Sequence, residues 1–434
     1  MRINFSSVMA IAMLAVGLSG CDSGGDGGDQ AYVRVLNVSP GYDSVDLYAE
    51  DENDDDGTNS LQLESVAYET VSDYAQLDSG TYTLQFRRSG VSGALETLSA
   101  QNLTDDSYTT YVAYGSSGNF AVVSISDDQE EPDAGETYVQ ILNAAEAVGA
   151  VDVYFTEASV ALDNVSPDFS DVGSGAKTLD SGTYRLRITG ADDTSDVRLD
   201  VPEITLDSEQ IISIILTSTP GGTLVNAMLI EQQGELTAYK NSKARVRGAV
   251  GIANGTTLTA RVGGVTLLSN ATRGAIGSTY SQVDAGTVPV TLIVDGTPVT
   301  VPNQTLTAGG DYTLLAWNNA EGTQTTLITD DNRLPTSSSR AKLRLINGMS
   351  GLGEPTNLAI DYAPVAEGVV LGQSSSFEEI NSGTDYRLDV SSASTTATLL
   401  TRTDITLQGS GVYTMFVAGD GTASGVSGIL RKDR

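Results

Sequence analysis

The hexapeptide LDSGTY occurs twice in this chain, at 77–82 and 179–184, and each copy contains the tripeptide Asp-Ser-Gly. Two such loops are what an aspartic protease requires, because its two carboxylates converge and share one proton. The same hexapeptide is also typical of a turn, in which glycine supplies a positive φ and threonine begins the next strand. Whether the chain is an enzyme depends first on which interpretation holds.

The hexapeptide is one copy of a fourfold repeat. Looser versions, VDAGTV and INSGTD, occur at 283–288 and 380–385. The four glycines are 102, 104 and 97 residues apart: Gly80, Gly182, Gly286 and Gly383. Equivalent turns of tandem domains lie about a domain length apart, and only Gly-Thr persists in all four copies. We therefore predict four structural hairpin turns and no catalytic dyad.

The remaining residue types leave little for catalysis. The chain has no histidine and one cysteine, Cys21, which excludes Ser-His-Asp and Cys-His nucleophiles, imidazole metal sites, internal disulfides and thiolate metal cages. Carboxylates, lysine, tyrosine, hydroxyls and oxygen-bound metals remain. We predict a protein without enzymatic activity or cofactor.

One acidic loop imitates the start of a calcium-binding loop. Glu52, Asp54, Asp56 and Gly57 follow the alternating acidic pattern of an EF-hand, but Leu63 occupies the twelfth position, where a carboxylate is required. No flanking helices are expected. A solvated loop is the prediction, and a weak calcium site is the alternative.

Charge restricts the partners. The formal net charge is −33, partly concentrated in the acidic runs at 51–56 and 127–133. Such a surface repels phosphate backbones, so nucleic-acid binding is excluded from the expected functions.

The N-terminus has the features of an export and anchoring sequence. Met1-Arg2 precedes a short apolar run at 8–18, which suits a signal peptide and is too short to span a bilayer comfortably. Leu18, Ser19, Gly20 and Cys21 then resemble the lipobox of bacterial lipoproteins, which implies lipidation of Cys21. The following segment, DSGGDGGDQ, has no apolar residue and is expected to be a flexible tether.

Strand patterns repeat with the glycines. YVRVLN at 32–37 and YVQILN at 138–143 alternate apolar and polar residues, and each is followed by a second strand, VDLYAE at 45–50 or VDVYFT at 151–156. About seven short strands per 95 residues indicate a β-sandwich. The predicted fold is all-β: four tandem Ig-like antiparallel β-sandwich domains, each about 95–100 residues long.

The repeats and the polar segments between them predict where each domain begins and ends. The predicted organisation is a lipoprotein signal peptide (1–20), a lipidated cysteine and tether (21–30), and four sandwiches at 31–128, 137–233, 243–331 and 340–434, of which the third is divergent. Joined by short linkers, the sandwiches could form a rod roughly 120–160 Å long if each measures about 30–40 Å.

The repeated motifs carry a family resemblance. The start V-R-V-L-N, the V-D-[LV]-Y strand, the S-G-T-Y segment and a late L-T-x-x-x-x-Y-T strand resemble the DUF4397 family of uncharacterised extracytoplasmic bacterial β-domains. The third copy lacks V-D-[LV]-Y, and the fourth has Asn381 in place of the turn aspartate. The resemblance implies an Ig-like sandwich, often in tandem and lipid-anchored, and no established activity.

The expected function is therefore a non-enzymatic lipoprotein of the bacterial cell envelope, on the periplasmic face or the outer membrane and cell surface. It would be held to the membrane by its N-terminal lipid and serve as a spacer, an adhesin or a binding array for an envelope protein or polysaccharide. The alternatives are calcium-dependent binding through the acidic loops and, less favoured, a carboxylate-dependent glycan or peptide hydrolase.

Overall fold

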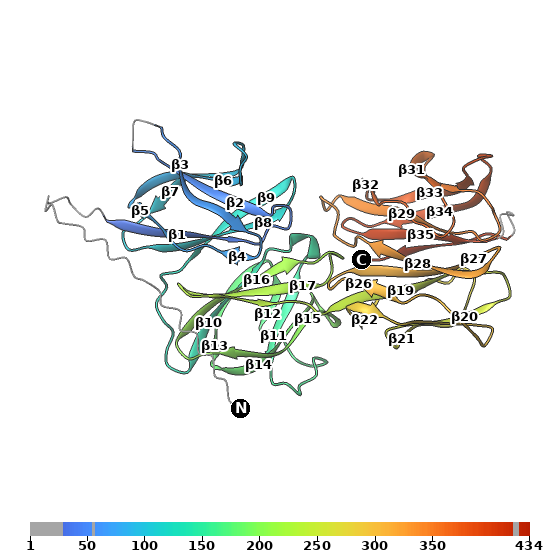
Figure 1. Cartoon of the computed structure of the whole chain (residues 1–434), viewed down its shortest axis with the longest axis horizontal. Coiled ribbons are helices and arrows are strands. Elements are labelled where there is room, and N and C mark those ends of the chain that lie inside the picture. The colour runs from blue at the N-terminus through green and yellow to red at the C-terminus, as the bar shows by residue number, and fades with distance from the viewer. Residues whose placement is uncertain (1–28, 54–56, 420–424) are drawn as a thin grey trace, which may run out of the picture.

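The computed structural model describes residues 29–53, 57–419 and 425–434 (Figure 1). Within these ranges the fold is all-β, with one short 3-10 turn, η1 (Glu146–Val148). None of the helical structure there is long and apolar enough to cross a membrane. The predicted fold class is confirmed: four β-sandwiches follow one another along the chain, each with its own apolar core.

The strands of the first two domains are as follows. The first domain contains β1 (Gln30–Asn37), β2 (Ser44–Asp51), β3 (Ser60–Ala67), β4 (Thr70–Val71), β5 (Ala75–Asp78), β6 (Gly80–Arg88), β7 (Ala94–Leu103), β8 (Tyr108–Ser116) and β9 (Asn119–Ser126). The second contains β10 (Glu136–Asn143), β11 (Val151–Thr156), β12 (Phe169–Val172), β13 (Ser174–Asp180), β14 (Gly182–Gly190), β15 (Asp193–Leu206), β16 (Gln210–Ser218), β17 (Val225–Glu231) and β18 (Leu236–Tyr239).

The other two domains repeat the pattern. The third contains β19 (Lys243–Gly251), β20 (Thr257–Val262), β21 (Val265–Thr272), β22 (Ser281–Asp284), β23 (Gly286–Val288), β24 (Val290–Val294), β25 (Thr297–Val299), β26 (Gln304–Leu306), β27 (Asp311–Asn319) and β28 (Gly322–Asp330). The fourth contains β29 (Arg340–Gly348), β30 (Thr356–Ile360), β31 (Ala363–Val369), β32 (Glu378–Asn381), β33 (Gly383–Ser392), β34 (Thr398–Leu407), β35 (Val412–Ala418) and β36 (Ser427–Lys432).

The fourth domain shows the shared topology most simply. One sheet has the order β32-β29-β35-β36 and the other β31-β30-β33-β34, so eight strands, one more than expected, form the sandwich. The pairing of β29 with β35 is parallel, and the corresponding pairs β1–β8, β10–β16 and β19–β27 are parallel too. Each sandwich is thus antiparallel except for the central pair of one sheet, whose two strands run in the same direction because the chain visits the other sheet between them.

The LDSGTY segment is a corner between the two sheets, and its prediction as a hairpin turn is wrong. β5 pairs with β1 in one sheet, whereas β6 pairs with β2 and β7 in the other, and only Ser79 separates β5 from β6. The strands flanking Ser181, Ala285 and Ser382 also pair in different sheets. The two strands beside each glycine therefore do not pair with each other, and the chain changes sheets at this point.

A tyrosine explains most of this repeated motif. The Tyr82 hydroxyl donates a hydrogen bond to the Asp78 carbonyl (3.0 Å), and Tyr184 does the same to Asp180 (2.9 Å). Each ring lies against the corner glycine: a Cβ on Gly80 would be 3.4 Å from a Tyr82 ring carbon. The glycine makes room for the ring, and the tyrosine ties the corner to the preceding strand.

The fourth domain keeps this contact and the third lacks it. The Tyr386 hydroxyl donates to the Asn381 carbonyl at 3.0 Å, and a Cβ on Gly383 would be 3.0 Å from that hydroxyl oxygen. In the third domain Val288, two residues after Gly286, occupies the position of the tyrosine, and a Cβ added to Gly286 would meet nothing within 4 Å. Gly286 (φ +105°) and Gly182 (φ +158°) have a positive φ, whereas Gly80 and Gly383 do not, so φ does not account for all four glycines.

The second strand of each domain anchors a bulge in its neighbour. A polar side chain on that strand accepts a hydrogen bond from the backbone N–H of a residue with positive φ, where the register of the two strands shifts. The pairs are Asp46–Ser65 (2.8 Å), Asp152–Asp171 (2.8 Å), Thr259–Asn270 (3.0 Å) and Asn357–Gly368 (2.7 Å). The V-D-[LV]-Y motif therefore persists in function in the third and fourth domains, with threonine and asparagine as the acceptors.

The domains pack in pairs, so the rod-like arrangement is wrong. Sheet faces of the first and second domains meet around Leu36, Val112, Ile215 and Met228, and the third and fourth meet around a second apolar cluster that includes Phe416. Figure 1 shows the two pairs side by side, the first and second domains stacked in one and the third and fourth in the other. Sheets that bury both faces can form such layers, which shortens the molecule.

Ion pairs cross between the third and fourth domains in both directions. Arg247 of the third contacts Asp433 of the fourth (2.5 Å), and Arg344 of the fourth contacts Asp330 of the third (2.6 Å). All four side chains are at most 2% exposed. The close approach also needs Gly251 and Gly348, since a Cβ on Gly251 would lie 2.8 Å from the Gly348 Cα. The two domains are thus joined as one unit.

Candidate functional site: a polar groove between the second and third domains

The residues predicted from sequence do not form a common site. Cys21 and its lipobox residues Leu18, Ser19 and Gly20 lie outside the described residues, as do Asp54 and Asp56. The Glu52 carboxylate accepts hydrogen bonds from the Thr83 hydroxyl (2.8 Å) and the Ala100 N–H (2.9 Å), and so belongs to the sheet of its own domain. In the described ranges no three His, Cys, Asp or Glu side chains are grouped so as to hold a metal ion.

The two Asp-Ser-Gly aspartates belong to different domains. Asp78 ends β5 and accepts a hydrogen bond from the Gln30 side chain (2.7 Å), and Asp180 ends β13 in the second domain. Each lies in the sheet of its own sandwich, paired with β1 or β10. Their role is in the corners described above.

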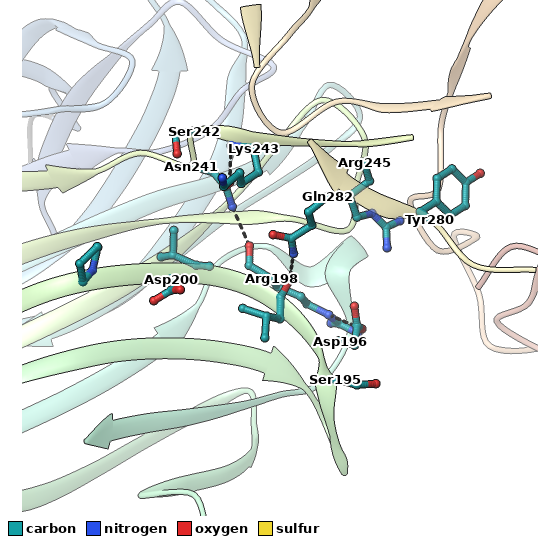
Figure 2. Close-up of a pocket in the computed structure, with 13 residues that line it drawn as sticks. Ser195, Asp196, Arg198, Asp200, Asn241, Ser242, Lys243, Arg245, Tyr280 and Gln282 are labelled. Atoms are coloured by element: carbon teal, nitrogen blue, oxygen red, sulfur yellow. Dashed lines mark hydrogen bonds and ion pairs between the residues drawn. The ribbon is translucent and has the colours of Figure 1, made fainter. Parts of the chain in front are cut away.

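A groove of about 680 Å³ lies where the second and third domains meet. One wall is β15, which supplies Ser195, Asp196, Arg198 and Asp200. The other is the segment after β18 and the strands β19 and β22 of the third domain. Figure 2 shows these side chains projecting around the groove from both domains. The site thus exists only when the second and third domains are in contact.

Direct hydrogen bonds fix the two walls. The Gln282 side-chain amide donates to the Val197 carbonyl at 2.5 Å, and the Asn241 amide donates to the Arg198 carbonyl at 2.7 Å. Both bonds connect a side chain to the backbone of β15, and both are visible in Figure 2. Asn241 is 7% exposed, so its amide is held in a single environment. The width of the groove is therefore set by the protein itself.

Each charge on the β15 wall has a partner. The Arg198 guanidinium contacts the Asp196 carboxylate at 2.8 and 3.0 Å and also donates to the Val148 carbonyl (2.9 Å). Arg185 forms a two-point ion pair with Asp200, at 2.7 and 2.5 Å. Charge-assisted pairs of this geometry fix the position of each carboxylate.

The opposite wall carries a cation whose side chain is 12% exposed. Arg245 contacts both carboxylate oxygens of Asp311 (2.8 and 2.6 Å) and lies 4.8 Å from the centroid of the Tyr280 ring. Burial acts to lower the pKa of Arg245, but the carboxylate of Asp311 outweighs it and the pKa is raised. Burial also raises the pKa of Tyr280 well above its usual value, with a contribution from Asp330. Tyr280 is therefore protonated at neutral pH and donates to Asp330 (2.7 Å).

The lining as a whole is close to neutral. Three basic and two acidic side chains line the groove, in a chain whose formal net charge is −33. Hydroxyl and amide groups of Ser195, Ser242 and Gln282 lie among them. The groove offers hydrogen-bond donors and acceptors without a strong field of either sign, which suits recognition of a polar ligand.

These residues were not found from the sequence. They lie in three short segments, 195–202, 241–245 and 280–282, none of which has a motif of its own. One indication is present: the polar segment between the second and third predicted sandwiches contains Asn241, whose amide donates to the Arg198 carbonyl of β15 and whose side-chain oxygen accepts from the Lys243 N–H of β19.

The solved structures that are similar to parts of this chain include the following three. The first is CBMbc (family CBM26) from Eubacterium rectale Amy13K in a complex with maltoheptaose, with 12% sequence identity, coverage of 48% of this chain and 96% of that chain, and a TM-score of 0.17. The second is a product complex of SpuA, a multi-modular glycogen-degrading pneumococcal virulence factor, with 10% identity, coverage of 85% of this chain and 37% of that chain, and a TM-score of 0.17. The third is the Bacillus anthracis TIE protein, with 10% identity, coverage of 92% of this chain and 75% of that chain, and a TM-score of 0.14. TM-scores this low carry no argument about function. No curated protein matches the chain.

The sequence family is clear. The model of a domain of unknown function, DUF4397, matches residues 31–154 and 244–354, which together are more than half of the chain. Both matches begin at the first strand of a domain, β1 or β19, and run into the domain that follows. With its repeated corners, anchored bulges and tandem sandwiches, the chain belongs to the DUF4397 family.

Proposed function

We propose that this protein is a non-enzymatic lipoprotein of the bacterial cell envelope, in which four sandwiches form one compact body that binds an envelope polysaccharide or protein. The groove between β15, β19 and β22 is the proposed binding site. The N-terminal lipid on Cys21 would hold this body at the membrane, on the periplasmic face or at the outer membrane and cell surface.

The observation that supports binding most directly is that two domains share the groove and lock its walls. The Gln282–Val197 and Asn241–Arg198 bonds leave the polar lining preformed. A preformed site loses little conformational entropy when a ligand binds. This is the geometry expected of a recognition site rather than of a simple spacer.

The groove chemistry favours binding over hydrolysis. A glycoside hydrolase requires a pair of carboxyl groups that are free to approach the scissile bond from two sides. Asp196 and Asp200 are both held by arginines, through Arg198 and Arg185. Calcium-dependent binding has no comparable support, because Glu52 already accepts two hydrogen bonds within its own sheet.

The anchor can be tested by metabolic labelling with a fatty acid that carries an alkyne. We expect the wild-type protein to be labelled and found with membranes, and the Cys21→Ser variant to be unlabelled and released. Labelling of Cys21→Ser at the wild-type level would contradict the proposal.

The groove can be tested by placing a photo-crosslinking amino acid at Ser195 or Ser242, which line it without joining its walls, and irradiating intact cells. Val91, which is 51% exposed in the first domain, provides the matched control position. We expect the same envelope component to be captured from both groove positions and not from Val91. Identical capture at all three positions, or none at the groove positions, would argue against this site.

A further inference from the structure

An exposed tyrosine occupies a strained position at the tip of a hairpin in the fourth domain. Asp361 and Tyr362 form the two-residue turn between β30 and β31, with φ of +43° and +68°. Tyr362 is 76% exposed, the highest value among the large hydrophobic side chains of the described residues. Turns with two positive φ values favour glycine, asparagine and aspartate, and a bulky ring there is unfavourable.

The third domain shows that this hairpin turn can fold without a side chain at either turn position. Its equivalent turn, between β20 and β21, consists of Gly263 and Gly264, with φ of +56° and +84°. The same backbone is therefore made there without any side chain. Because tyrosine is costly at this position and the fold does not require it, its presence indicates a role outside the fold, as strained residues often do.

Neighbouring side chains hold the ring in place. The Arg387 guanidinium lies 5.0 Å from the centroid of the Tyr362 ring. Arg387 is fixed in turn by two contacts with the Asp389 carboxylate (2.7 and 2.9 Å), and Asp389 accepts a hydrogen bond from the Thr401 hydroxyl (2.6 Å). The Asp361 carboxylate accepts a hydrogen bond from the backbone N–H of Arg387 at 2.8 Å, which ties the turn to β33. The ring is thus preorganised.

Polar groups extend from the ring across the outer face of the sheet. Asp389 lies between the buried residues Leu388 and Val390, so its side chain faces outward, and it pairs across the strands with Ala359 and Thr401. An exposed aromatic face therefore adjoins a row that contains a carboxylate, a guanidinium and a hydroxyl. An apolar plane with hydrogen-bonding groups at its edge matches the two aspects of a pyranose, the C–H face and the rim of hydroxyls.

We propose that Tyr362 is a stacking platform for a sugar ring of a neutral polysaccharide, with the Arg387 guanidinium, whose side chain is 38% exposed, facing its hydroxyl groups and Asp389 holding that guanidinium in place. The net charge of −33 disfavours anionic polymers, and Arg387 beside the ring disfavours a cation. This site lies on the fourth domain, away from the groove of the second and third, and does not depend on it.

The test is electrophoresis of the full-length protein in native gels that contain soluble starch, dextran, hydroxyethyl cellulose or mannan. We expect at least one of these polysaccharides to retard the wild type. Tyr362→Gly should weaken that binding by about tenfold or more, the scale of effect for loss of a stacking aromatic, whereas Tyr362→Phe should keep it within about threefold because stacking does not need the hydroxyl. Val370→Ala, at an apolar residue 50% exposed in the same domain, is the control and should bind as the wild type does.

A second measurement separates function from folding. Tyr362→Gly should raise the urea midpoint of the protein, since glycine adopts this φ without strain. Loss of binding together with higher stability would support a ring kept for recognition. The proposal is overturned if no polysaccharide retards the wild type, if Tyr362→Gly binds normally, or if Tyr362→Gly lowers the urea midpoint.

Discussion

Tyr184 illustrates what one side chain contributes in these domains. Its hydroxyl closes the corner between β13 and β14, and its ring packs against the apolar core of the second domain. The Asp-Ser-Gly that precedes it resembles catalytic machinery, yet the contact that recurs in three domains is made by the tyrosine hydroxyl and a backbone carbonyl.

We expect Tyr184→Phe to lower the free energy of unfolding of the second domain by about 0.5–1.5 kcal/mol, because one hydrogen bond is lost while the ring remains. Native-state hydrogen exchange of the β13 and β14 amides measures this change.

The matched control is Asp180→Ala, which removes the exposed carboxylate but keeps the carbonyl acceptor. Its effect should remain within about 0.5 kcal/mol, as for other surface substitutions. If Asp180→Ala proved more destabilising than Tyr184→Phe, the corner would depend on the aspartate and our account of the motif would be incorrect.

At the scale of elements, the bulge anchored by Asp152 contributes more to stability than the Tyr184 hydrogen bond does. The Asp152 carboxylate accepts hydrogen bonds from the N–H groups of Asp171 (2.8 Å) and Asp192 (3.0 Å), and its side chain is buried. We expect Asp152→Ala to cost at least about 2 kcal/mol, since two partly buried donors lose their acceptor. Exchange of the β12 amides should accelerate accordingly.

Asp152→Asn provides the comparison, because the fourth domain uses Asn357 for the same purpose. The asparagine variant retains one acceptor oxygen and should lose less stability than the alanine variant. Equal losses in the two variants would show that the negative charge, not the hydrogen bond, stabilises the bulge.

The strands themselves were predictable from sequence, and their partners were not. Alternation in β6 places Tyr82, Leu84 and Phe86 inward, as period two requires. The same pattern does not specify whether β5 pairs with β6 or with β1, because both arrangements bury the same residues. The corner was therefore mistaken for a hairpin.

The packing of the domains in pairs is reflected in the sequence by strands that are apolar at successive positions, but this pattern does not specify which domain covers the second face. β16 and β35 are apolar at successive positions, and the structure shows why: Ile214 faces the core of the second domain whereas Ile215 faces the first domain. A strand buried on both faces loses its alternation. The groove was still harder to foresee, since its walls meet only after the domains adopt their relative orientation.

The joined third and fourth domains give a prediction about acidity for the whole molecule. Burial acts to raise the pKa of Asp330, but Arg344 and Arg247 outweigh it and hold the pKa below its usual value. A carboxyl group whose folded pKa is depressed stabilises the protein above its unfolded pKa, which is about 3.9, and loses this contribution as the pH falls through the folded pKa. The stability of this pair should therefore fall on acidification below about pH 4.

Asp330→Asn should flatten this acid dependence and cost about 3–5 kcal/mol at pH 7, because Arg344 would remain buried without its carboxylate. The only tryptophan, Trp317, packs beside the interface and reports its unfolding by fluorescence. Asp284→Asn, in an exposed pair with Lys243, is the control and should cost no more than about 1 kcal/mol. An unchanged acid profile for Asp330→Asn would refute the assignment.

The compact arrangement makes a prediction for scattering in solution. A chain of 434 residues that folds into a compact body has a radius of gyration of about 22 Å, with some increase for four lobes. A rod of roughly 120–160 Å would give a value of roughly 35–46 Å, since its radius of gyration is its length divided by √12. Small-angle X-ray scattering should therefore give a value well under 35 Å, and one in the rod range would mean that the domain pairs separate.

The two reciprocal ion pairs, in which Arg247 and Arg344 each contact an aspartate of the other domain, have a consequence for the origin of the molecule. Each face offers an arginine and an aspartate to a partner that offers the same two groups in return, which is the self-complementary contact of an isologous dimer. Two copies of a single ancestral domain could form that contact without any linker. Tandem duplication then places both halves of a homodimer in one polypeptide, where pairing no longer depends on concentration and each half is free to diverge.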